Sequence, residues 1–159
     1  MKSKTPIRTL LAAVAATIAV PTMSVLPALA HSAPCPYCNM AITQDTPTQD
    51  NETVMKYGRK RIEYKCVYCA VDEANTEYKT GDLTIAAPSE KKGAHVIIKR
   101  TGGKWSAPAT AAFVSTARRK HKVRQAQARA FTTKAAAQAY AKKNGGDVLT
   151  LAQLVARAK

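Results

Sequence analysis

The sequence predicts an α+β fold made of two similar strand–strand–helix–strand (ββαβ) units. Two observations support this prediction. Residues 53–93 change from the alternation of β-forming residues to helical spacing, and then return to a strand pattern. Residues 94–159 repeat this order of elements, which also indicates an internal duplication. We therefore divide the chain into residues 1–30, 31–52, 53–93 and 94–159.

The first thirty residues have the pattern of a secretory signal peptide. Lys2, Lys4 and Arg8 introduce an apolar run from Thr9 to Val20, and Ala28-Leu29-Ala30 offers small residues for cleavage. As a helix the apolar run would be only about 18 Å long, whereas a hydrocarbon core is about 30 Å thick. We therefore expect cleavage after this segment, a periplasmic mature chain and no membrane-spanning segment.

The first unit is expected to place a hairpin before a helix. Residues that favour strands flank a turn at Gly58-Arg59-Lys60, and apolar residues then recur at helical spacing. The expected elements are strands Thr53–Tyr57 and Arg61–Tyr64, a helix Val67–Tyr78 that ends before Gly81, and a strand Leu83–Ala86.

The second unit follows the same order. Gly102-Gly103 marks a turn, Thr133 can cap a helix, and Asn144-Gly145-Gly146 can end it in the left-handed conformation that Gly and Asn adopt. The expected elements are strands Ala94–Arg100, Ala111–Ser115 and Lys122–Phe131, a helix Lys134–Lys143, a strand Val148–Leu151 and a short helix to Lys159.

The chain is strongly basic, with a formal charge of +15. Such a surface attracts nucleic acid, anionic lipid or an acidic protein, and export argues against nucleic acid. We interpret the densest basic run, residues 118–124, as a solvated face, with His121 solvated in it, and His95 as a structural strand residue. No Ser–His–Asp grouping, phosphate loop or carboxylate pair stands out, so we expect no enzyme.

The four cysteines form two Cys-x-x-Cys pairs, Cys35/Cys38 and Cys66/Cys69. This spacing lets both sulfurs of a pair face one point, so each pair can supply half of a four-sulfur site. Met40 follows Cys38 after one residue, and thiolates with a thioether are soft ligands that suit Cu(I). The pattern predicts a Cu(I) site that begins in residues 31–52, with zinc as the alternative metal.

Other interpretations of the cysteines stay open. Exported proteins commonly pair cysteines as disulfides, and four thiolates can also form a closed structural zinc site. We expect residues 31–52 to be a flexible leader, so the sulfurs could form one site or two. His31 would be the mature N-terminus, where its imidazole and α-amine could both bind copper.

A thiol–disulfide oxidoreductase is the alternative from another functional class. The redox motif of such enzymes lies at the start of a helix, where the helix dipole lowers the thiol pKa. Cys35 and Cys38 have no strand before them, whereas Cys66 and Cys69 open the expected helix and fit this context better.

The sequence resembles the NosL family, the accessory copper proteins of nitrous-oxide reductase. The segment Cys35-Pro36-Tyr37-Cys38-Asn39-Met40 is similar to the Cys-Pro-x-Cys-Gly-Met start of that family. Trp105 and the strand Ala112-Phe113-Val114 fall about where the family has a Trp and an Ala-Phe-Tyr-Val strand. Residues 130–149 resemble the family's Phe, Ala-rich helix, Gly-Gly and final strand.

The resemblance implies two similar ββαβ units and the delivery of Cu(I) to a copper-receiving periplasmic or membrane protein. It implies Cys35, Cys38 and Met40 as ligands.

Three features depart from the family pattern. Residues 32–35 form a poor lipobox, although family members are commonly lipoproteins. A basic stretch, residues 117–127, replaces a Met-Gly segment, and Cys66 and Cys69 are additional.

Overall fold

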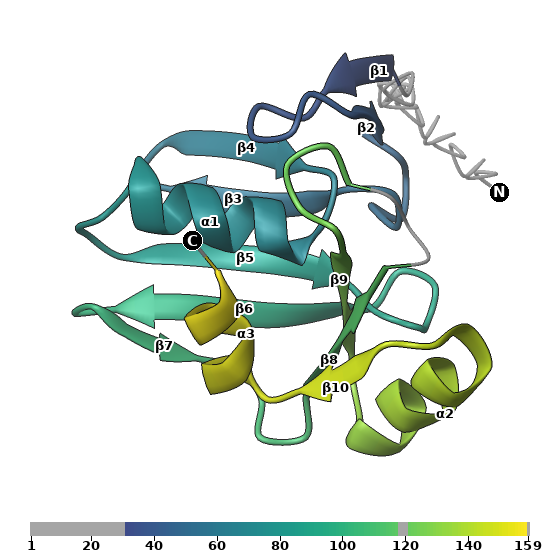
Figure 1. The fold of residues 1–159 in the computed structure, drawn as a ribbon. Helices are drawn as coiled ribbons and strands as arrows, with labels where there is room; N and C mark the ends of the chain where they lie inside the picture. The colour runs from purple at the N-terminus through teal and green to yellow at the C-terminus, as the bar shows by residue number, and fades with distance from the viewer. Residues whose placement is uncertain (1–30, 118–120, 159) are drawn as a thin grey trace, which may run out of the picture.

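The computed structural model describes residues 31–117 and 121–158. The expected signal peptide, residues 1–30, lies outside the described residues, as do positions 118–120 of the basic run. The described chain is a mixed α/β fold with three helices and ten strands in three sheets (Figure 1). This confirms the mixed class expected from the sequence. In the described part of the chain, none of the helices has the length and apolar character needed to cross a membrane.

The largest sheet is antiparallel, with the strand order β4-β3-β5-β6-β7. Gly58, in the left-handed conformation, makes the tight turn from β3 to β4. Along β5 the buried residues alternate with partly exposed ones, as expected for a strand with one covered face. The strands are β3 (Thr53–Tyr57), β4 (Lys60–Tyr64), β5 (Leu83–Pro88), β6 (His95–Thr101) and β7 (Lys104–Ser106).

Helix α1 (Val67–Thr76) covers one face of this sheet, and it ends earlier than the expected Tyr78. Every residue from Val67 to Ala74 is buried, including Asp72 and Glu73. The helix is covered on more than one side because the sheet lies beneath it and β9 (Gln127–Phe131) packs on it as well. Two of the acidic side chains of this helix are therefore inside the molecule.

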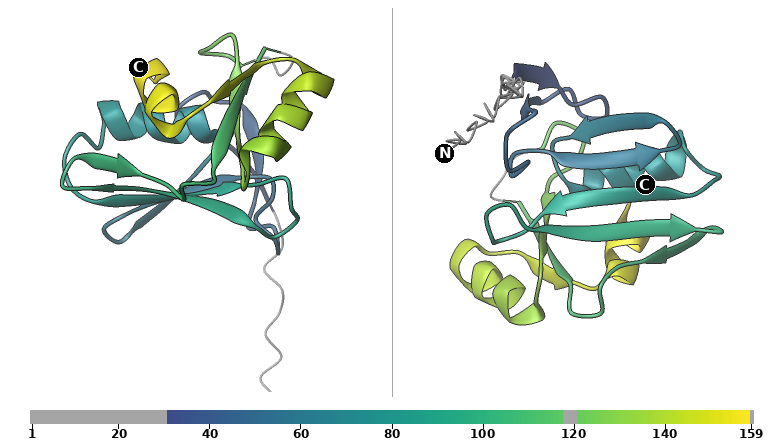
Figure 2. Two further views of the ribbon diagram at one scale, coloured as in Figure 1. Left: turned by 90° about the horizontal axis from the view of Figure 1, so that it is seen from below. Right: turned by 180° about the vertical axis from the view of Figure 1, so that it is seen from behind.

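The second sheet has the order β10-β8-β9 and carries α2. Figure 2 shows α1 and α3 on the same side of the five-stranded sheet, with the three-stranded sheet and α2 beside them. Thr133 caps α2 as expected, and Thr150 with Gln153 forms a capping box at α3. The elements are β8 (Ala112–Thr116), β10 (Asp147–Leu149), α2 (Lys134–Asn144) and α3 (Leu151–Arg157).

The two expected units share the five-stranded sheet, to which residues 94–159 contribute β6 and β7. Strands β5 and β6 pair from Leu83–Arg100 to Pro88–His95, so the division at residue 93 passes between neighbouring strands. The segment β8-β9-α2-β10 has the same order of strands and helix along the chain as the segment β3-β4-α1-β5. In each segment the first strand lies between the other two strands in its sheet. An internal duplication nevertheless stays a prediction.

Two segments differ from the expectations. Residues 31–52 are not a flexible leader, because β1 (His31–Pro34) and β2 (Ala41–Gln44) form an antiparallel hairpin that places Cys35 and Cys38 in the core. The strand expected over Lys122–Phe131 begins only at Gln127. Residues 121–126 instead form a loop, because side-chain and backbone contacts described below turn this segment toward α1.

Candidate metal centre

One Cys-x-x-Cys pair lies at the start of α1. Cys66 is the N-cap residue, with extended backbone angles, and its side chain makes no capping hydrogen bond. Cys69 lies in the first turn, so both side chains fall on one side of the helix. Their Sγ atoms are 3.6 Å apart. The helix start therefore presents two sulfurs together.

The other pair lies in the turn of the β1–β2 hairpin. The Cys35 N–H donates to the Met40 carbonyl at 2.9 Å, and the Asn39 N–H donates to the Cys35 carbonyl at 2.8 Å. Asn39 has a φ of 54°, a left-handed conformation that Asn tolerates. The turn directs Cys38 at the helix, where its sulfur lies 3.7 Å from that of Cys69.

The donor atoms form two groups that share Cys69. In each group all ligand atoms lie within 4.8 Å of one another. Among the described residues, no such group contains both Cys38 and Cys66. All four cysteines are buried, and Cys66 is the most exposed at 5%. The members are Cys35, Cys38 and Cys69 in the first group and Cys66, Cys69 and His121 in the second.

His121 is not solvated, contrary to the expectation from its basic surroundings. Its side chain is 9% exposed, and Nε2 lies 3.0 Å from the Cys69 sulfur. The backbone N–H groups of Val123 and Arg124 both donate to Nδ1, at 3.2 and 3.1 Å. Nδ1 therefore carries no proton, and in the neutral ring the proton lies on Nε2. His121 thus donates a hydrogen bond to Cys69.

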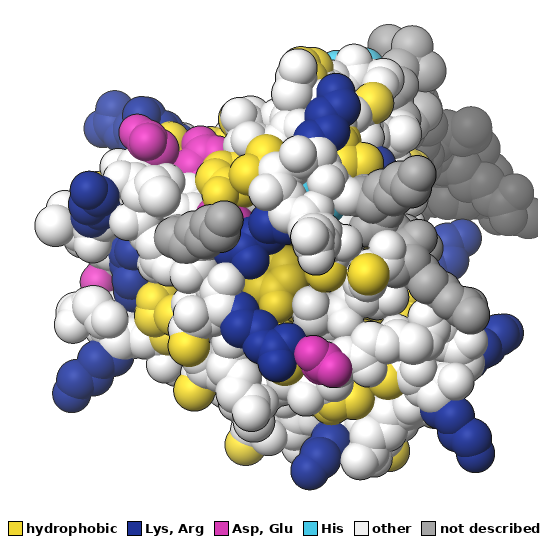
Figure 3. All heavy atoms as spheres, in the orientation of Figure 1, with side chains coloured by type: hydrophobic (Ala, Val, Ile, Leu, Met, Phe, Trp, Pro, Cys, Tyr) yellow, Lys and Arg dark blue, Asp and Glu magenta, His cyan; other side chains and the backbone are white. Residues whose placement is uncertain are grey.

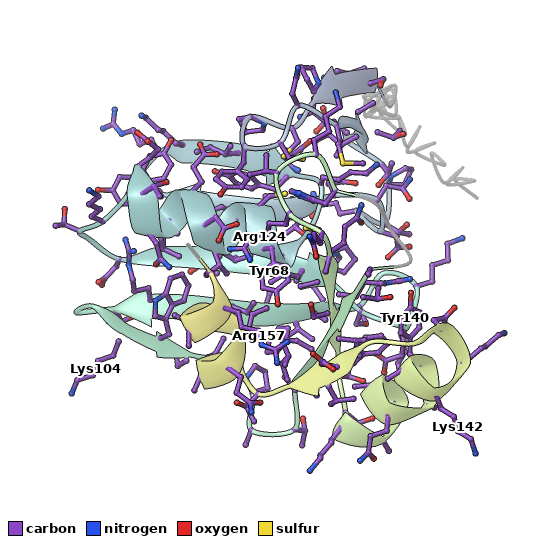
Figure 4. All side chains as sticks on the ribbon, in the orientation of Figure 1. Tyr68, Lys104, Arg124, Tyr140, Lys142 and Arg157 are labelled. Atoms are coloured by element: carbon purple, nitrogen blue, oxygen red, sulfur yellow. The ribbon has the colours of Figure 1, made fainter. Side chains whose placement is uncertain are left out.

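A buried ion pair fixes the loop that carries His121. Arg124 binds the Asp72 carboxylate with two guanidinium nitrogens, and the Nε–Oδ2 distance is 2.5 Å. The same guanidinium lies over the Tyr68 ring, 4.4 Å from its centroid (Figure 4). Lys122 Nζ adds a bond of 3.2 Å to the Asn39 carbonyl. The loop is thereby tied both to α1 and to the hairpin turn.

Proximity of the sulfurs changes their acidity. Hydrogen bonding from Cys69 lowers the pKa of Cys35 to about 5 and the pKa of Cys66 well below its usual value. The same bonds, to Cys35 first and then to Cys66, raise the pKa of Cys69. Burial raises the pKa of Cys38. The metal-free centre therefore holds thiolates and thiols side by side at neutral pH.

The other two predicted ligands are Met40 and His31. Met40 is partly buried against the core beside the hairpin turn. His31 is exposed, and its Nδ1 lies 3.4 Å from Asp45 Oδ2. His31 belongs to neither of the two donor groups found among the described residues. His95 lies in β6 with Nε2 3.1 Å from the Gln49 carbonyl, in keeping with a structural role.

Basic side chains are scattered over the face of the molecule drawn in Figure 3. Figure 3 shows Lys and Arg around the edge and across the middle of one face, with few acidic side chains among them. Arg157 lies near Tyr68 and Arg124 on this face and is paired with Asp147. This face therefore offers positive charge without a single concentrated patch.

Comparison with known proteins identifies the family. The NosL family profile matches residues 26–158. A comparison with curated proteins gives no match. Among solved structures, the crystal structure of the mercury-bound form of MerB2 has a TM-score of 0.52 at 14% sequence identity. That alignment covers 70% of this chain and 56% of MerB2, and it supports a likeness of fold. Since the family match extends over most of the sequence, including both Cys-x-x-Cys pairs, the chain belongs to the NosL family.

Proposed function

We propose that this protein is a Cu(I)-binding accessory protein that holds the ion through Cys35, Cys38 and Cys69. The observation that carries the proposal is the first donor group, in which three buried sulfurs from both Cys-x-x-Cys pairs lie within 4.8 Å of one another. Metal–thiolate bonds of about 2.3 Å place the sulfurs of a trigonal site about 4 Å apart. The Cys38–Cys69 distance of 3.7 Å is close to that value.

The donor number favours Cu(I) over zinc. Structural zinc sites are almost always four-coordinate and tetrahedral, whereas Cu(I) is stable with three thiolates. The group around Cys35 has three protein donors, and no hard oxygen ligand belongs to it. Met40 follows in the same turn, and its thioether is a further soft donor that Cu(I) accepts and zinc rarely recruits.

The family supports an accessory role rather than catalysis. NosL proteins are accessory copper proteins, and we propose delivery of Cu(I) to a copper-receiving periplasmic or membrane protein. The scattered basic surface would attract an acidic partner.

Export is part of the proposal. Intact-mass analysis of protein from the cell envelope should give a chain that begins at His31, whereas a lipid-modified chain that begins at Cys35 would refute the unlipidated form.

A competition titration against a Cu(I) chelator under anaerobic conditions tests the proposal. Cys38→Ser should weaken Cu(I) binding at least tenfold, or about 1.4 kcal/mol. Met40→Leu should weaken Cu(I) binding and leave any zinc binding unchanged. The control is the melting temperature of each metal-free variant, which separates loss of a ligand from loss of the fold. Unchanged Cu(I) affinity in Cys35→Ser/Cys38→Ser would rule out this site.

One observation favours a second candidate function. Cys66 and Cys69 lie at a helix start, and the pKa of Cys66 is well below its usual value, with the hydrogen bond from Cys69 as the largest cause. These are features of dithiol oxidoreductases. Reduction of insulin at thioredoxin-like rates by the metal-free protein would favour this alternative.

A further inference from the structure

The sulfur atoms form a row rather than a single shell. Cys69 lies between its neighbours, 3.7 Å from Cys38 on one side and 3.6 Å from Cys66 on the other. The described donor groups place Cys38 and Cys66 in separate triads, joined through Cys69 alone. An ion bound by Cys35, Cys38 and Cys69 therefore has a further cysteine sulfur, that of Cys66, next to one of its ligands.

A polar cavity of about 250 Å³ reaches the end of this row. Of the five donor residues, only Cys66 lines it. Three side chains on its wall, Glu52, Thr53 and Gln127, are buried yet polar. Thr43 of the hairpin is an exposed wall residue. The cavity is therefore a hollow that an exposed residue and Cys66 both line.

The spacing suits movement of Cu(I) by ligand exchange. Two metal–thiolate bonds of about 2.3 Å span up to about 4.6 Å, so a Cu(I) ion can be bound to two sulfurs 3.6 or 3.7 Å apart at once. A new bond can form before the old one breaks. The ion then moves along the row without passing through water.

We propose that Cys66 is the transfer ligand of this protein and that the polar cavity beside it is where a partner's thiolate or thioether side chain exchanges copper. This rests on the proposed function. In the step, a Cu–S bond to Cys66 forms while the bond to Cys35 or Cys38 breaks. The Cys66 thiolate supplies the electron pair of the new bond, the released sulfur keeps its own electron pair as a thiolate, and copper stays Cu(I). The other of these two bonds breaks next, so that Cys66 and Cys69 hold the ion. The partner's soft donor then takes the place of Cys69, and the bond to Cys66 breaks last, as a further ligand from the partner or solvent takes its place.

The size of the cavity limits what can enter it. A helix with its side chains is about 10 Å wide, which a hollow of about 250 Å³ does not admit. One extended Met or Cys side chain can enter. We therefore infer a partner that presents a single soft donor on a projecting loop or terminus.

The experiment measures the rate of copper transfer separately from affinity. The Cu(I)-loaded protein is mixed by stopped flow with a short peptide that contains one methionine beside a small Cu(I) indicator. Cys66→Ser should keep Cu(I) affinity within threefold of wild type and slow transfer at least tenfold. Thr43→Trp, on the cavity wall, should slow transfer in the same way.

A matched variant controls for the added tryptophan. Thr110 is also an exposed threonine, and it lines a different cavity, so Thr110→Trp should transfer copper at the wild-type rate. Wild-type transfer rates in both Cys66→Ser and Thr43→Trp would overturn the route while leaving the copper site intact. If Cys66→Ser loses affinity as much as Cys38→Ser, then Cys66 is a resident ligand and the inference fails. If the wild-type protein does not bind Cu(I), the proposed function fails as well as the transfer route.

Discussion

Cys69 determines the chemistry of the centre at the scale of single residues. Its sulfur belongs to both donor groups and accepts the hydrogen bond from His121. It also hydrogen-bonds to Cys35 and Cys66, and these bonds lower the pKa of each. A buried thiolate would be unfavourable by itself, but hydrogen bonds to the charged form offset the cost of burial. The row is therefore prepared to bind a soft cation before the metal arrives.

The acidity of Cys35 gives the first prediction. Because the pKa of Cys35 is lowered to about 5, the Cys35 contribution to the thiolate ultraviolet absorbance of the reduced, metal-free protein should be present at pH 7 and disappear as the pH falls through about 5. An unperturbed thiol would already be protonated below about pH 8. The lowered pKa also stabilises the fold fully above the unfolded-state pKa of about 8.5, and this contribution disappears as the pH falls through about 5. Cys35→Ser should remove the absorbance transition near pH 5, and its persistence would refute the assignment to Cys35.

The hydrogen bonds of His121 give the second prediction. Since two backbone N–H groups occupy Nδ1, the ring should carry its proton on Nε2 in the metal-free protein. If His121 acts only as a donor to Cys69, the proton should also remain there after Cu(I) binds. Nitrogen-15 NMR of labelled histidine distinguishes the two ring nitrogens directly. Loss of the Nε2 proton on copper loading would instead make His121 a ligand.

At the scale of elements, two connections position the site. The β1–β2 turn and the loop 121–126 meet over the start of α1, and Lys122 Nζ donates to the Asn39 carbonyl between them. The Asp72–Arg124 pair joins the loop to α1. Breaking such a buried pair by removing one partner typically costs about 3–5 kcal/mol, because the remaining charge stays buried. The pair therefore holds His121 over Cys69.

The connection from α2 to β10 gives the third prediction. Gly146 has a φ of 119°, and a Cβ at this position would lie 2.4 Å from the backbone oxygen of Ser115 in β8. Gly146→Ala should therefore destabilise the protein by about 3 kcal/mol or more. Gly145→Ala is the matched control, because Gly145 also has a positive φ but no atom within 4 Å of the added carbon. Urea unfolding of both variants measures the difference, and equal losses would contradict the steric argument.

At the scale of the whole molecule, the centre joins segments that are distant in sequence. Cys38 and Cys69 are 31 positions apart, and Cys69 and His121 are 52 apart. A metal bound by Cys35, Cys38 and Cys69 would fasten the hairpin to the helix on the main sheet. Binding to the folded state alone stabilises that state by mass action.

This gives the fourth prediction. With free Cu(I) buffered at about one hundred times the dissociation constant, the free energy of unfolding should rise by about 2.7 kcal/mol. Anaerobic thermal unfolding with and without buffered Cu(I) measures the change. Cys38→Ser should lose most of this stabilisation at the same copper concentration. An equal shift in Cys35→Ser/Cys38→Ser would place the copper elsewhere.

The sequence by itself determined the elements whose pattern is local. The alternation in residues 53–64, the helix that begins at Val67 and the Thr133 cap can all be read from neighbouring residues, because propensity and capping act over one or two turns. The two Cys-x-x-Cys pairs and the family motif also indicated soft-metal chemistry. The burial of Asp72 and Glu73 could not be read from the sequence, because it depends on what packs over them.

Only the tertiary structure decided how the donors combine. His121 looked solvated because it lies among basic residues, and no local pattern shows that Arg124 would turn inward to Asp72 and bring the loop with it. In the same way, spacing alone allowed one four-sulfur site or two sites. The packing of the hairpin on α1 instead produced two donor groups that share Cys69. The physical reason is that these contacts join residues far apart in sequence, and their geometry follows from the packing of whole elements rather than from any neighbouring residue.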